Sequence, residues 1–340
     1  MAFQKKAGTH GGVPGATLRQ MLEFAGLVVF GRIVRCLPRR WLVPSARALG
    51  SITYLLDSKG RVVSRQNLDA VFGDRMDAAE KARVARSGYV GFARTMIELF
   101  WSPNLTEKIA RGLFATEGVG KTQEAAIFIT THSSNFEWLG QNLGFLIGPG
   151  IVVAQQLKNP LLGRYFDSLR GNSGHTVIPQ ERAISRMLTH LRSGGYFCVL
   201  VDLNLDPGEA SVIIDEFSGL KTCVTQIHAA LALHTGAKII PSECIPLPDG
   251  SYRMLYHPPL KIADGATPAD IAQQCWDVLE PGILSRPECW LWSYKHWRFR
   301  PSGTDTGRYP PYANRAKRFD SALRKSRPPG AAAALHSGRK

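Results

Sequence analysis

The strongest constraint on the fold of this chain is the alternation of short apolar runs with helical patterns after about residue 125. Most of the apolar runs have the length of a strand and precede a segment of helical spacing, as in strand–helix–strand units. We predict strands at 125–132, 151–155, 175–178, 196–203, 237–245 and 252–257. We predict helices at 136–147, 160–171, 181–193, 224–235 and 268–285. The chain should therefore be an α/β protein with a mixed, mostly parallel sheet flanked by helices.

The pattern changes at both ends of this alternating region. Residues 18–112 have mainly helical spacing, and 302–340 are rich in Gly, Pro, Ala and basic residues, as are 1–16. Such composition is typical of flexible segments. We therefore expect a flexible basic N-terminus at 1–16, a helical region at 17–112, an α/β domain at 113–301 and a flexible basic tail at 302–340. A chain of 340 residues is long enough to bury a sizeable core.

The formal charge of +15 is concentrated at the two ends of the chain. Residues 1–50 hold eight Lys and Arg against one Glu, and 302–340 hold nine against two Asp, which leaves +1 for the middle. Basic ends indicate an anionic partner, which is nucleic acid, an acidic protein or a membrane surface. We favour an anionic membrane surface over nucleic acid, because the N-terminal charges are interleaved with apolar residues.

This interleaving predicts a membrane-docking helix at the start of the 17–112 region. Apolar residues recur at helical spacing and basic residues follow closely, as in helices that lie in a bilayer interface. The uninterrupted apolar run, 24–30, is much shorter than the roughly 20 residues of a membrane span. Both peripheral attachment and a single pass stay open at this point, as does an ordinary helix packed on a protein core. The apolar residues are Leu18, Met21, Leu22, Ala25, Val28 and Val29, and the basic ones are Arg32, Arg35, Arg39 and Arg40.

Several cofactor and metal classes lack their sequence signatures. The six cysteines form no C-x-x-C pair, which is typical of reduced thiols in a protein that faces the cytosol. Residues 115–122 nearly match a phosphate-binding loop, but Ala115 replaces its first Gly and a predicted strand follows where a helix is required. We therefore expect no metal and no cofactor.

The segment from His132 to Glu137 is the main candidate for catalysis. It follows the predicted strand 125–132 and opens the predicted helix 136–147, at the carboxyl edge where α/β proteins bind ligands. A His with a nearby carboxylate is suited to general-base catalysis. Within one helix, side chains five residues apart lie about 140° apart around the axis. The two can meet only if His132 lies in the turn and Glu137 in the first helical turn, with Asn135 or Ser134 as N-cap. By spacing alone, a surface His beside a capping Glu is equally compatible.

Six segments in the same order connect this chain to a known family. They are Arg65-Gln66-Asn67-Leu68, His132 to Glu137, Lys158-Asn159-Pro160 with Arg170, Asp202 to Asn204 with Phe217-Ser218-Gly219, Gly236 to Pro241, and Tyr294 to Arg298. From about 61 to 301 the sequence resembles the bacterial lipid A biosynthesis acyltransferases of the lauroyl and myristoyl type. These belong to the lysophospholipid acyltransferase superfamily with an H-x4-D/E motif. The resemblance implies a glycerolipid acyltransferase-like fold at the cytoplasmic face of a bacterial inner membrane.

The resemblance also implies a reaction and roles for residues. An acyl chain would move from a thioester on acyl carrier protein or CoA to a hydroxyl of a lipid acceptor, most simply a lipid A-type glycolipid. His132 would act as general base, with Glu137 holding its tautomer. Arg170 would donate to the developing oxyanion or to a phosphate, and Asp202 would orient Arg170 or position substrate. Asn135, Lys158 and Asn204 complete the expected substrate-binding set.

Some alternatives remain open at the level of sequence. Ser134, Phe136, Leu203 and Ser218 depart from the family pattern of Gly, Trp, Gln and Phe, which leaves the acceptor open. Other acceptors are a lysophospholipid, a phosphatidylinositol mannoside or an amino-acid lipid, and a non-catalytic membrane-binding protein is the rival from another class. The aromatic segment 290–297 would rest at the headgroup level or pack in the core.

Overall fold

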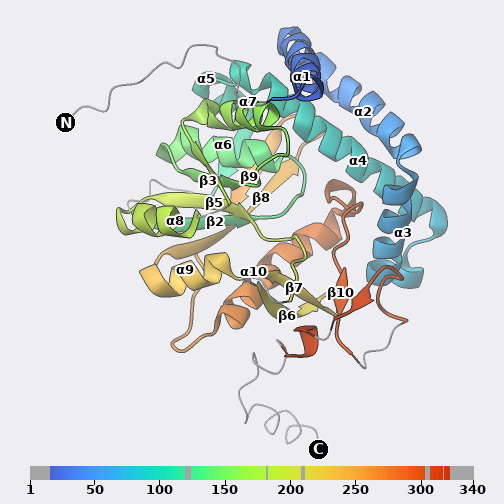
Figure 1. The fold of residues 1–340 in the computed structure, drawn as a ribbon, viewed down its shortest axis with the longest axis vertical. Coiled ribbons are helices and arrows are strands. Elements are labelled where there is room, and N and C mark those ends of the chain that lie inside the picture. Colours follow the sequence, from blue (N-terminus) through green and yellow to red (C-terminus); the bar gives the residue numbers. More distant parts are fainter. Residues whose placement is uncertain are drawn as a thin grey trace, which may run out of the picture.

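The computed structural model describes residues 16–118, 124–180, 183–207, 211–302, 307–316 and 318–321 (Figure 1). The α-helices are α1 (Leu18–Cys36), α2 (Arg39–Leu56), α3 (Ser58–Phe72), α4 (Ala78–Trp101), α5 (Glu107–Leu113), α6 (Phe136–Ile147), α7 (Pro160–Arg170), α8 (Ala183–Arg192), α9 (Ile227–Thr235) and α10 (Pro268–Ser285). The strands are β1 (Phe114–Glu117), β2 (Ala126–Thr130), β3 (Ile151–Ala154), β4 (Thr176–Pro179), β5 (Tyr196–Leu200), β6 (Ser211–Phe217), β7 (Leu220–Thr225), β8 (Lys238–Pro246), β9 (Tyr252–Tyr256), β10 (Phe299–Arg300) and β11 (Asn314–Arg315).

A seven-stranded sheet with the order β1-β9-β8-β2-β5-β3-β4 forms the centre of the protein. Its neighbouring strands are parallel except for β8 and β9, which pair antiparallel. The predicted mixed, mostly parallel α/β sheet is therefore confirmed. The parallel strands β2 and β5 lie side by side near the middle of the sheet, so their carboxyl ends reach the same edge.

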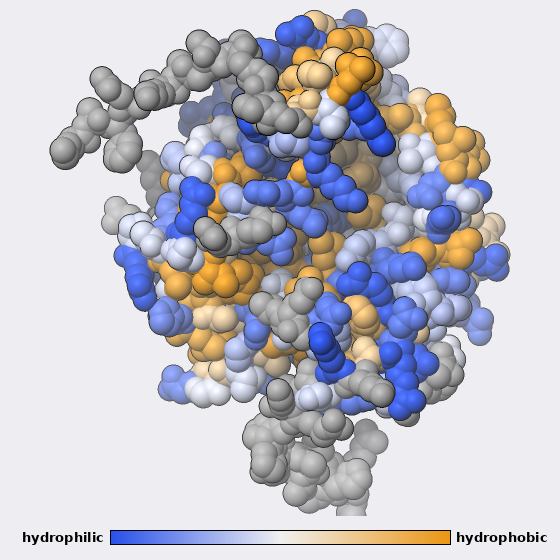
Figure 2. Space-filling view, in the orientation of Figure 1, coloured by the Kyte–Doolittle hydropathy of each residue, from blue (hydrophilic) through white to orange (hydrophobic). Residues whose placement is uncertain are grey.

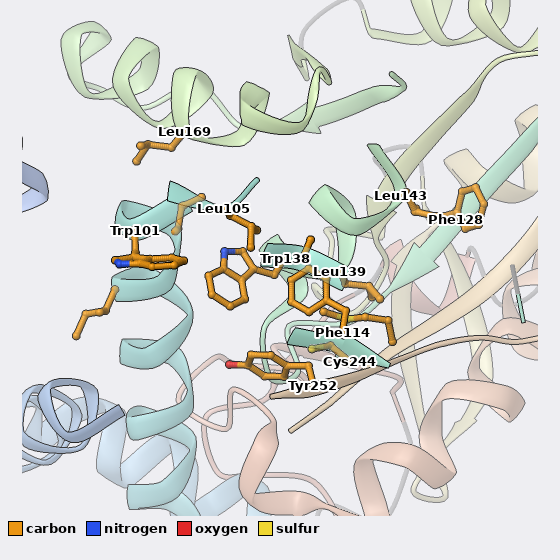
Figure 3. Packing of buried hydrophobic residues seen from close by; sticks show 14 of the residues in the cluster. Trp101, Leu105, Phe114, Phe128, Trp138, Leu139, Leu143, Leu169, Cys244 and Tyr252 are labelled. Atoms are coloured by element: carbon orange, nitrogen blue, oxygen red, sulfur yellow. The ribbon is translucent and has the colours of Figure 1, made fainter. Parts of the chain in front are cut away.

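Helices cover both faces of this sheet, which explains the nearly continuous apolar sequence of its central strands. In β2, Ala126 and Phe128 pack in the cluster that includes α4, α6 and α7, whereas Ile127 and Ile129 pack against α8, α9 and α10. Figure 3 shows the first cluster, in which Trp138 of α6 lies between α4 and the strands β1 and β9. The indole of Trp138 donates to Ser102 Oγ, 2.9 Å away, so its polar atom is satisfied in the core.

The predicted helical character of 17–112 is confirmed by α1 to α5. Helix α1 packs its inner side on α4 and α7, with Phe24 against Tyr165 and Phe30 against Phe100. Its other side carries exposed apolar residues, and Figure 2 shows hydrophobic side chains gathered over α1 and α2. Among the described residues, no helix has the length and apolar content that a membrane span requires.

The chain differs from the sequence prediction in several places, and the short strands β1, β10 and β11 are among the elements that were not predicted. An unpredicted antiparallel hairpin, β6 and β7, occupies 211–225, so the helix expected at 224–235 begins only at Ile227. The tail expected to be flexible from 302 on is partly packed, because Tyr309 and Phe319 are buried in apolar clusters. Residues 1–15, 181–182 and 322–340 lie outside the described residues, so the expectations for them stay predictions.

Candidate functional site

The register of β2 and β5 brings two of the predicted site residues together. Thr130 pairs with Leu200 at the ends of these parallel strands, and the amide of Val201 donates to the carbonyl of Thr130. His132 and Asp202 each come two residues after this last pair. The two strands therefore place them side by side at the carboxyl edge of the sheet. This is the edge at which α/β proteins place their ligand sites.

His132 and Asp202 form a closely bonded pair. The Nδ1 atom of the imidazole lies 2.7 Å from Oδ1 of Asp202, and the backbone amide of His132 donates to Oδ2 at 2.8 Å. The Asp202 carboxylate is fully buried, whereas the His132 side chain keeps 18% of its exposure. An ionised carboxylate can only accept, so Nδ1 carries the proton in the neutral ring and Nε2 keeps its lone pair. That tautomer is the one that can accept a proton at Nε2.

The pair is electrostatically coupled. Burial opposes ionisation of Asp202, but the His132 charge and hydrogen bonds outweigh it and lower the pKa of this carboxyl to about 2. Burial also favours neutral His132, but the charges of Asp202 and, further off, Glu137 raise the pKa of the imidazole above its ordinary 6.5. A protonated ring is therefore well stabilised at this position.

Glu137 does not hold the imidazole, in contrast to its expected role. It lies in the first turn of α6, and its carboxylate accepts from Arg170 at the end of α7, with Nη2 at 2.7 Å and Nε at 3.0 and 3.1 Å. The expectation that Asp202 orients Arg170 is also wrong. Arg170 is bonded to Glu137, and Asp202 is bonded to His132. The bonds to Glu137 use Nε and Nη2 of Arg170 and do not use Nη1.

Hydrogen bonds from other parts of the chain fix the turn between β2 and α6. Ser134 has a positive φ of 50°, a conformation that suits Gly and is unusual for Ser. Its carbonyl accepts from the Thr95 hydroxyl at 2.7 Å, and its amide donates to the carbonyl of Cys289 at 2.8 Å. Contacts from α4 and from the segment after α10 thus fix the backbone that carries His132.

Asn135 is a structural residue of this turn and not a substrate contact. It is buried, its Oδ1 caps α6 by accepting from the amide of Trp138, and its Nδ2 donates to Glu98 at 2.7 Å. Glu98 of α4 is fully buried and also receives Arg39 and Arg94, both at 3.1 Å, and the hydroxyl of Tyr252. The predicted N-cap is confirmed, and both polar ends of the Asn135 amide are occupied within the protein.

A cavity of about 790 Å³ opens beside His132 between the sheet and the helices α6 and α7. His132, Glu137 and Arg170 line it, and most of the other lining residues are apolar. A space of this size, with a few polar groups at one place in an apolar wall, is typical of a small-molecule or lipid site. Apolar lining residues from α4, β2, α6, α7 and α8 are Met96, Phe128, Leu139, Leu143, Phe166 and Met187.

The two remaining predicted binding residues are not among the lining residues of this cavity. Lys158 is exposed before α7 and is not among the lining residues. Asn204 is buried, and its Nδ2 donates to Thr222 and to the carbonyl of Cys223 on β7. The structure thus brings together His132, Glu137 and Arg170 at the cavity, with Asp202 behind His132.

The tryptophans of the segment 290–297 lie in the core, and Trp290 also contacts the site, so of the two predicted placements the packing in the core is confirmed and the headgroup level is wrong. Trp290, Trp292 and Trp297 are all buried, and the Trp290 indole donates to Asp202 Oδ2 at 2.9 Å. Sequence reasoning missed Trp290, because 88 residues separate it from Asp202. It also missed the pair of His257 and Glu243, 2.8 Å apart, because no carboxylate lies near His257 in the sequence.

Comparison with known proteins finds relatives of this chain among bacterial acyltransferases. The sequence model of the bacterial lipid A biosynthesis acyltransferases matches residues 15–299. The lipid A biosynthesis lauroyltransferase of Escherichia coli is 23% identical over 300 residues, covering 84% of this chain and 94% of that protein. A phosphatidylinositol mannoside acyltransferase of Mycolicibacterium smegmatis is 29% identical over 180 residues, covering 51% of this chain and 56% of that protein. The 1-acyl-sn-glycerophosphate acyltransferase structure from Thermotoga maritima covers 69% of this chain and 97% of its own, at 16% identity and a TM-score of 0.33.

The match over most of the chain defines the class of protein. This chain belongs to the bacterial lipid A biosynthesis acyltransferase family. It is an O-acyltransferase that acts on a lipid acceptor.

Proposed function

We propose that this protein transfers a fatty acyl chain from a thioester donor to a hydroxyl of a membrane glycolipid of the lipid A precursor type, with His132 as general base. The observation that carries the proposal is the His132–Asp202 pair, whose imidazole lines a mostly apolar cavity. The cavity has the volume and lining to take an acyl chain, and the bonded Nδ1 leaves Nε2 to take a proton from the acceptor. Acyl carrier protein is the donor we favour over CoA, since its acidic surface suits a basic protein.

The reaction follows from these positions. Nε2 of His132 removes the hydroxyl proton as the acceptor oxygen attacks the thioester carbonyl carbon. Asp202 keeps the ring in the Nδ1–H tautomer and stabilises the imidazolium. Collapse of the tetrahedral intermediate breaks the carbon–sulfur bond, and the imidazolium returns its proton to the leaving thiolate. Glu137 adds negative charge near the imidazolium and holds Arg170, whose remaining N–H groups serve the oxyanion or a phosphate of a substrate.

A phosphatidylinositol mannoside is the second candidate acceptor. It is favoured by the mycobacterial relative, whose name gives that acceptor. Both acceptor classes present sugar hydroxyls on a membrane anchor, and the same His132 chemistry serves either one.

Product identification tests the proposed function. The purified full chain is incubated with vesicles that contain a lipid A precursor, a phosphatidylinositol mannoside or a lysophospholipid, and with acyl carrier protein or CoA thioesters in parallel. Mass spectrometry should show one added acyl chain on the lipid A precursor, and the His132→Ala protein serves as the inactive control. Acylation of the mannoside alone would select the second candidate, and equal acylation by His132→Ala would rule out His132 as the base.

We also propose that α1 and α2 dock this enzyme on an anionic membrane. Leu18, Leu22, Val29 and Ile33 form one exposed stripe on α1 at helical spacing. Apolar residues with large exposed fractions also lie on α2, up to 79% at Leu56. Isolated apolar residues on a surface are ordinary, but a continuous stripe with flanking Arg residues suits the headgroup region.

Vesicle flotation tests this docking surface. The double substitution of Leu22→Glu and Ile33→Glu should weaken binding to phosphatidylglycerol-containing vesicles by about tenfold or more, because two charges would replace apolar groups in the interface. Leu233→Glu is the matched control, since Leu233 is a half-exposed Leu on α9. Equal binding by all three proteins would contradict the docking role of α1.

A further inference from the structure

The segment after α10 forms part of the wall behind the catalytic pair. Trp290 makes an antiparallel bridge with Ser133, and the carbonyl of Cys289 accepts from the amide of Ser134. The backbone next to His132 is therefore joined to a segment more than 150 positions further along the chain. Trp290 itself is fully buried, so its indole N–H needs a partner within the protein.

That partner is the carboxylate that orients His132. The Trp290 Nε1 donates to Oδ2 of Asp202 at 2.9 Å, and the same oxygen accepts from the backbone amide of His132 at 2.8 Å. The other oxygen, Oδ1, faces the imidazole Nδ1 at 2.7 Å. Two donors on Oδ2 and one on Oδ1 define the rotation of the carboxylate, and loss of the indole donor would leave the His132 amide alone to hold Oδ2.

The indole cannot easily move away from this position. Its ring stacks on His296 with centroids 3.8 Å apart and an angle of 20° between the planes. Trp292 and Phe217 contact it edge to face, at 4.8 and 5.3 Å. The Nε2 of His296 is in turn bonded to the carbonyl of Leu291 at 2.9 Å. The donor is therefore held by packing on several sides, as a positioning group requires.

We propose that Trp290 is a positioning residue for acyl transfer, whose indole N–H holds Asp202 in the orientation that keeps His132 in its base-competent tautomer. The inference rests on the proposed role of His132 as general base. Trp290 is not among the residues that line the cavity, so it acts through Asp202 and not on the substrate. A hydrogen bond to a buried charged group contributes enough to change a rate by roughly ten- to a hundredfold.

The inference includes a pH signature. The groups that face Asp202 are His132, His296 and Tyr294, and Glu137 lies beyond His132. Burial keeps the pKa of His296 at about 4, so this ring stays neutral over the working range. Without the indole donor the Asp202 carboxylate is less stabilised and attracts the imidazolium more strongly. The acid limb of the kcat/KM profile should therefore move to higher pH.

Trp290→Phe and Trp297→Phe in the full-length enzyme form the matched pair. Trp297 is equally buried and stacks on Phe217 at 5.0 Å, but its Nε1 has no hydrogen-bond partner within the described part of the chain. Trp290→Phe should lower kcat by about ten- to a hundredfold, leave the KM for the acyl donor within about twofold, and shift the acid limb upward. Trp297→Phe should keep kcat within about twofold and leave the acid limb in place.

A near-isosteric substitution keeps the test decisive if Trp290→Phe does not fold. Site-specific 3-benzothienylalanine at position 290 replaces the N–H by sulfur and retains the bicyclic ring, and it should reproduce the kcat loss and the pH shift. Wild-type kcat and an unmoved acid limb in that protein would overturn the role of Trp290. The role of Trp290 would also be overturned if Trp290→Phe and Trp297→Phe lost the same kcat and neither moved the acid limb. The loss would then be due to packing. Full activity of His132→Ala would instead overturn the proposed function, so the two failures are distinguishable.

Discussion

The Asp202→Asn enzyme should lose about 10³- to 10⁴-fold in turnover, nearly as much as His132→Ala, while its fold and substrate KM change little. An Asn amide that donates to Nδ1 selects the opposite tautomer, with the proton on Nε2, and such a ring cannot accept a proton from the acceptor. The amide also removes the charge that stabilises the imidazolium. Steady-state kinetics with the acyl donor varied, together with a thermal unfolding curve, measure the effect.

Glu137→Gln provides the comparison that separates the two carboxylates. Glu137 is bonded to Arg170 and not to the imidazole, so its loss should cost only about ten- to a hundredfold. A larger loss in Glu137→Gln than in Asp202→Asn would show that the H-x4-E carboxylate, and not Asp202, orients the base.

The pH dependence of the wild-type enzyme has a definite sign. His132 must be neutral to act as base, and its pKa is raised above 6.5. The kcat/KM should therefore rise with pH and reach half of its plateau above 6.5. The stabilisation that the charged ring gives to the fold has the opposite trend, because it is complete below 6.5 and is lost as the pH rises through the raised pKa. A half-plateau below 6.5 would contradict the coupling of His132 to Asp202.

Glu98→Ala should lower the free energy of unfolding by about 3–5 kcal/mol. This is the largest effect on stability that we expect from a single substitution. The carboxylate of Glu98 is fully buried and is bonded to Arg39, Arg94, Asn135 and Tyr252. Its removal leaves two largely buried guanidinium groups without a counter-charge and also releases the Asn135 amide that caps α6. Urea unfolding followed by circular dichroism measures the change in unfolding free energy.

Glu107→Ala is the surface control for this prediction. Glu107 and Arg111 form an exposed pair on α5, with side-chain exposures of 54% and 78%, and such pairs contribute at most about 1 kcal/mol. Glu98→Gln keeps the shape and some of the hydrogen bonds, so it isolates the charge. If Glu98→Ala unfolds at the same urea concentration as Glu107→Ala, then the buried cluster is not an important part of the fold's stability.

Much of the fold could be predicted because its strands and helices have clear periodicity. All six predicted strands exist, with ends that differ by no more than three residues. The hairpin of β6 and β7 was missed because Val224 fits both a helical stripe and a strand, and because the helix that follows is short. The strand β1 was missed because four residues at the edge of a sheet carry little pattern.

Four residues that the structure brings together, His132, Glu137, Arg170 and Asp202, were among the predicted ones, but their pairing was not predicted. Strand position is sufficient to bring His132 and Asp202 to one edge, whereas the choice of partner for each carboxylate depends on strand order and register. Glu137 and Arg170 were expected to act separately, yet the packing of α6 beside α7 joins them. Glu98 carried a weak signal as the single acidic residue in the run 96–101.

The distances along the chain between the residues of the proposed site also affect when this site can form. His132 lies 70 residues before Asp202, and Asp202 lies 88 residues before Trp290. Contacts between such distant positions require the closure of long loops, and they are therefore slow to form. During synthesis on the ribosome, α1 and α2 emerge well before Trp290, whose indole donates to Asp202. The proposed site can therefore assemble only after residue 290 has emerged, and a truncated chain that ends before residue 290 lacks the indole that donates to Asp202.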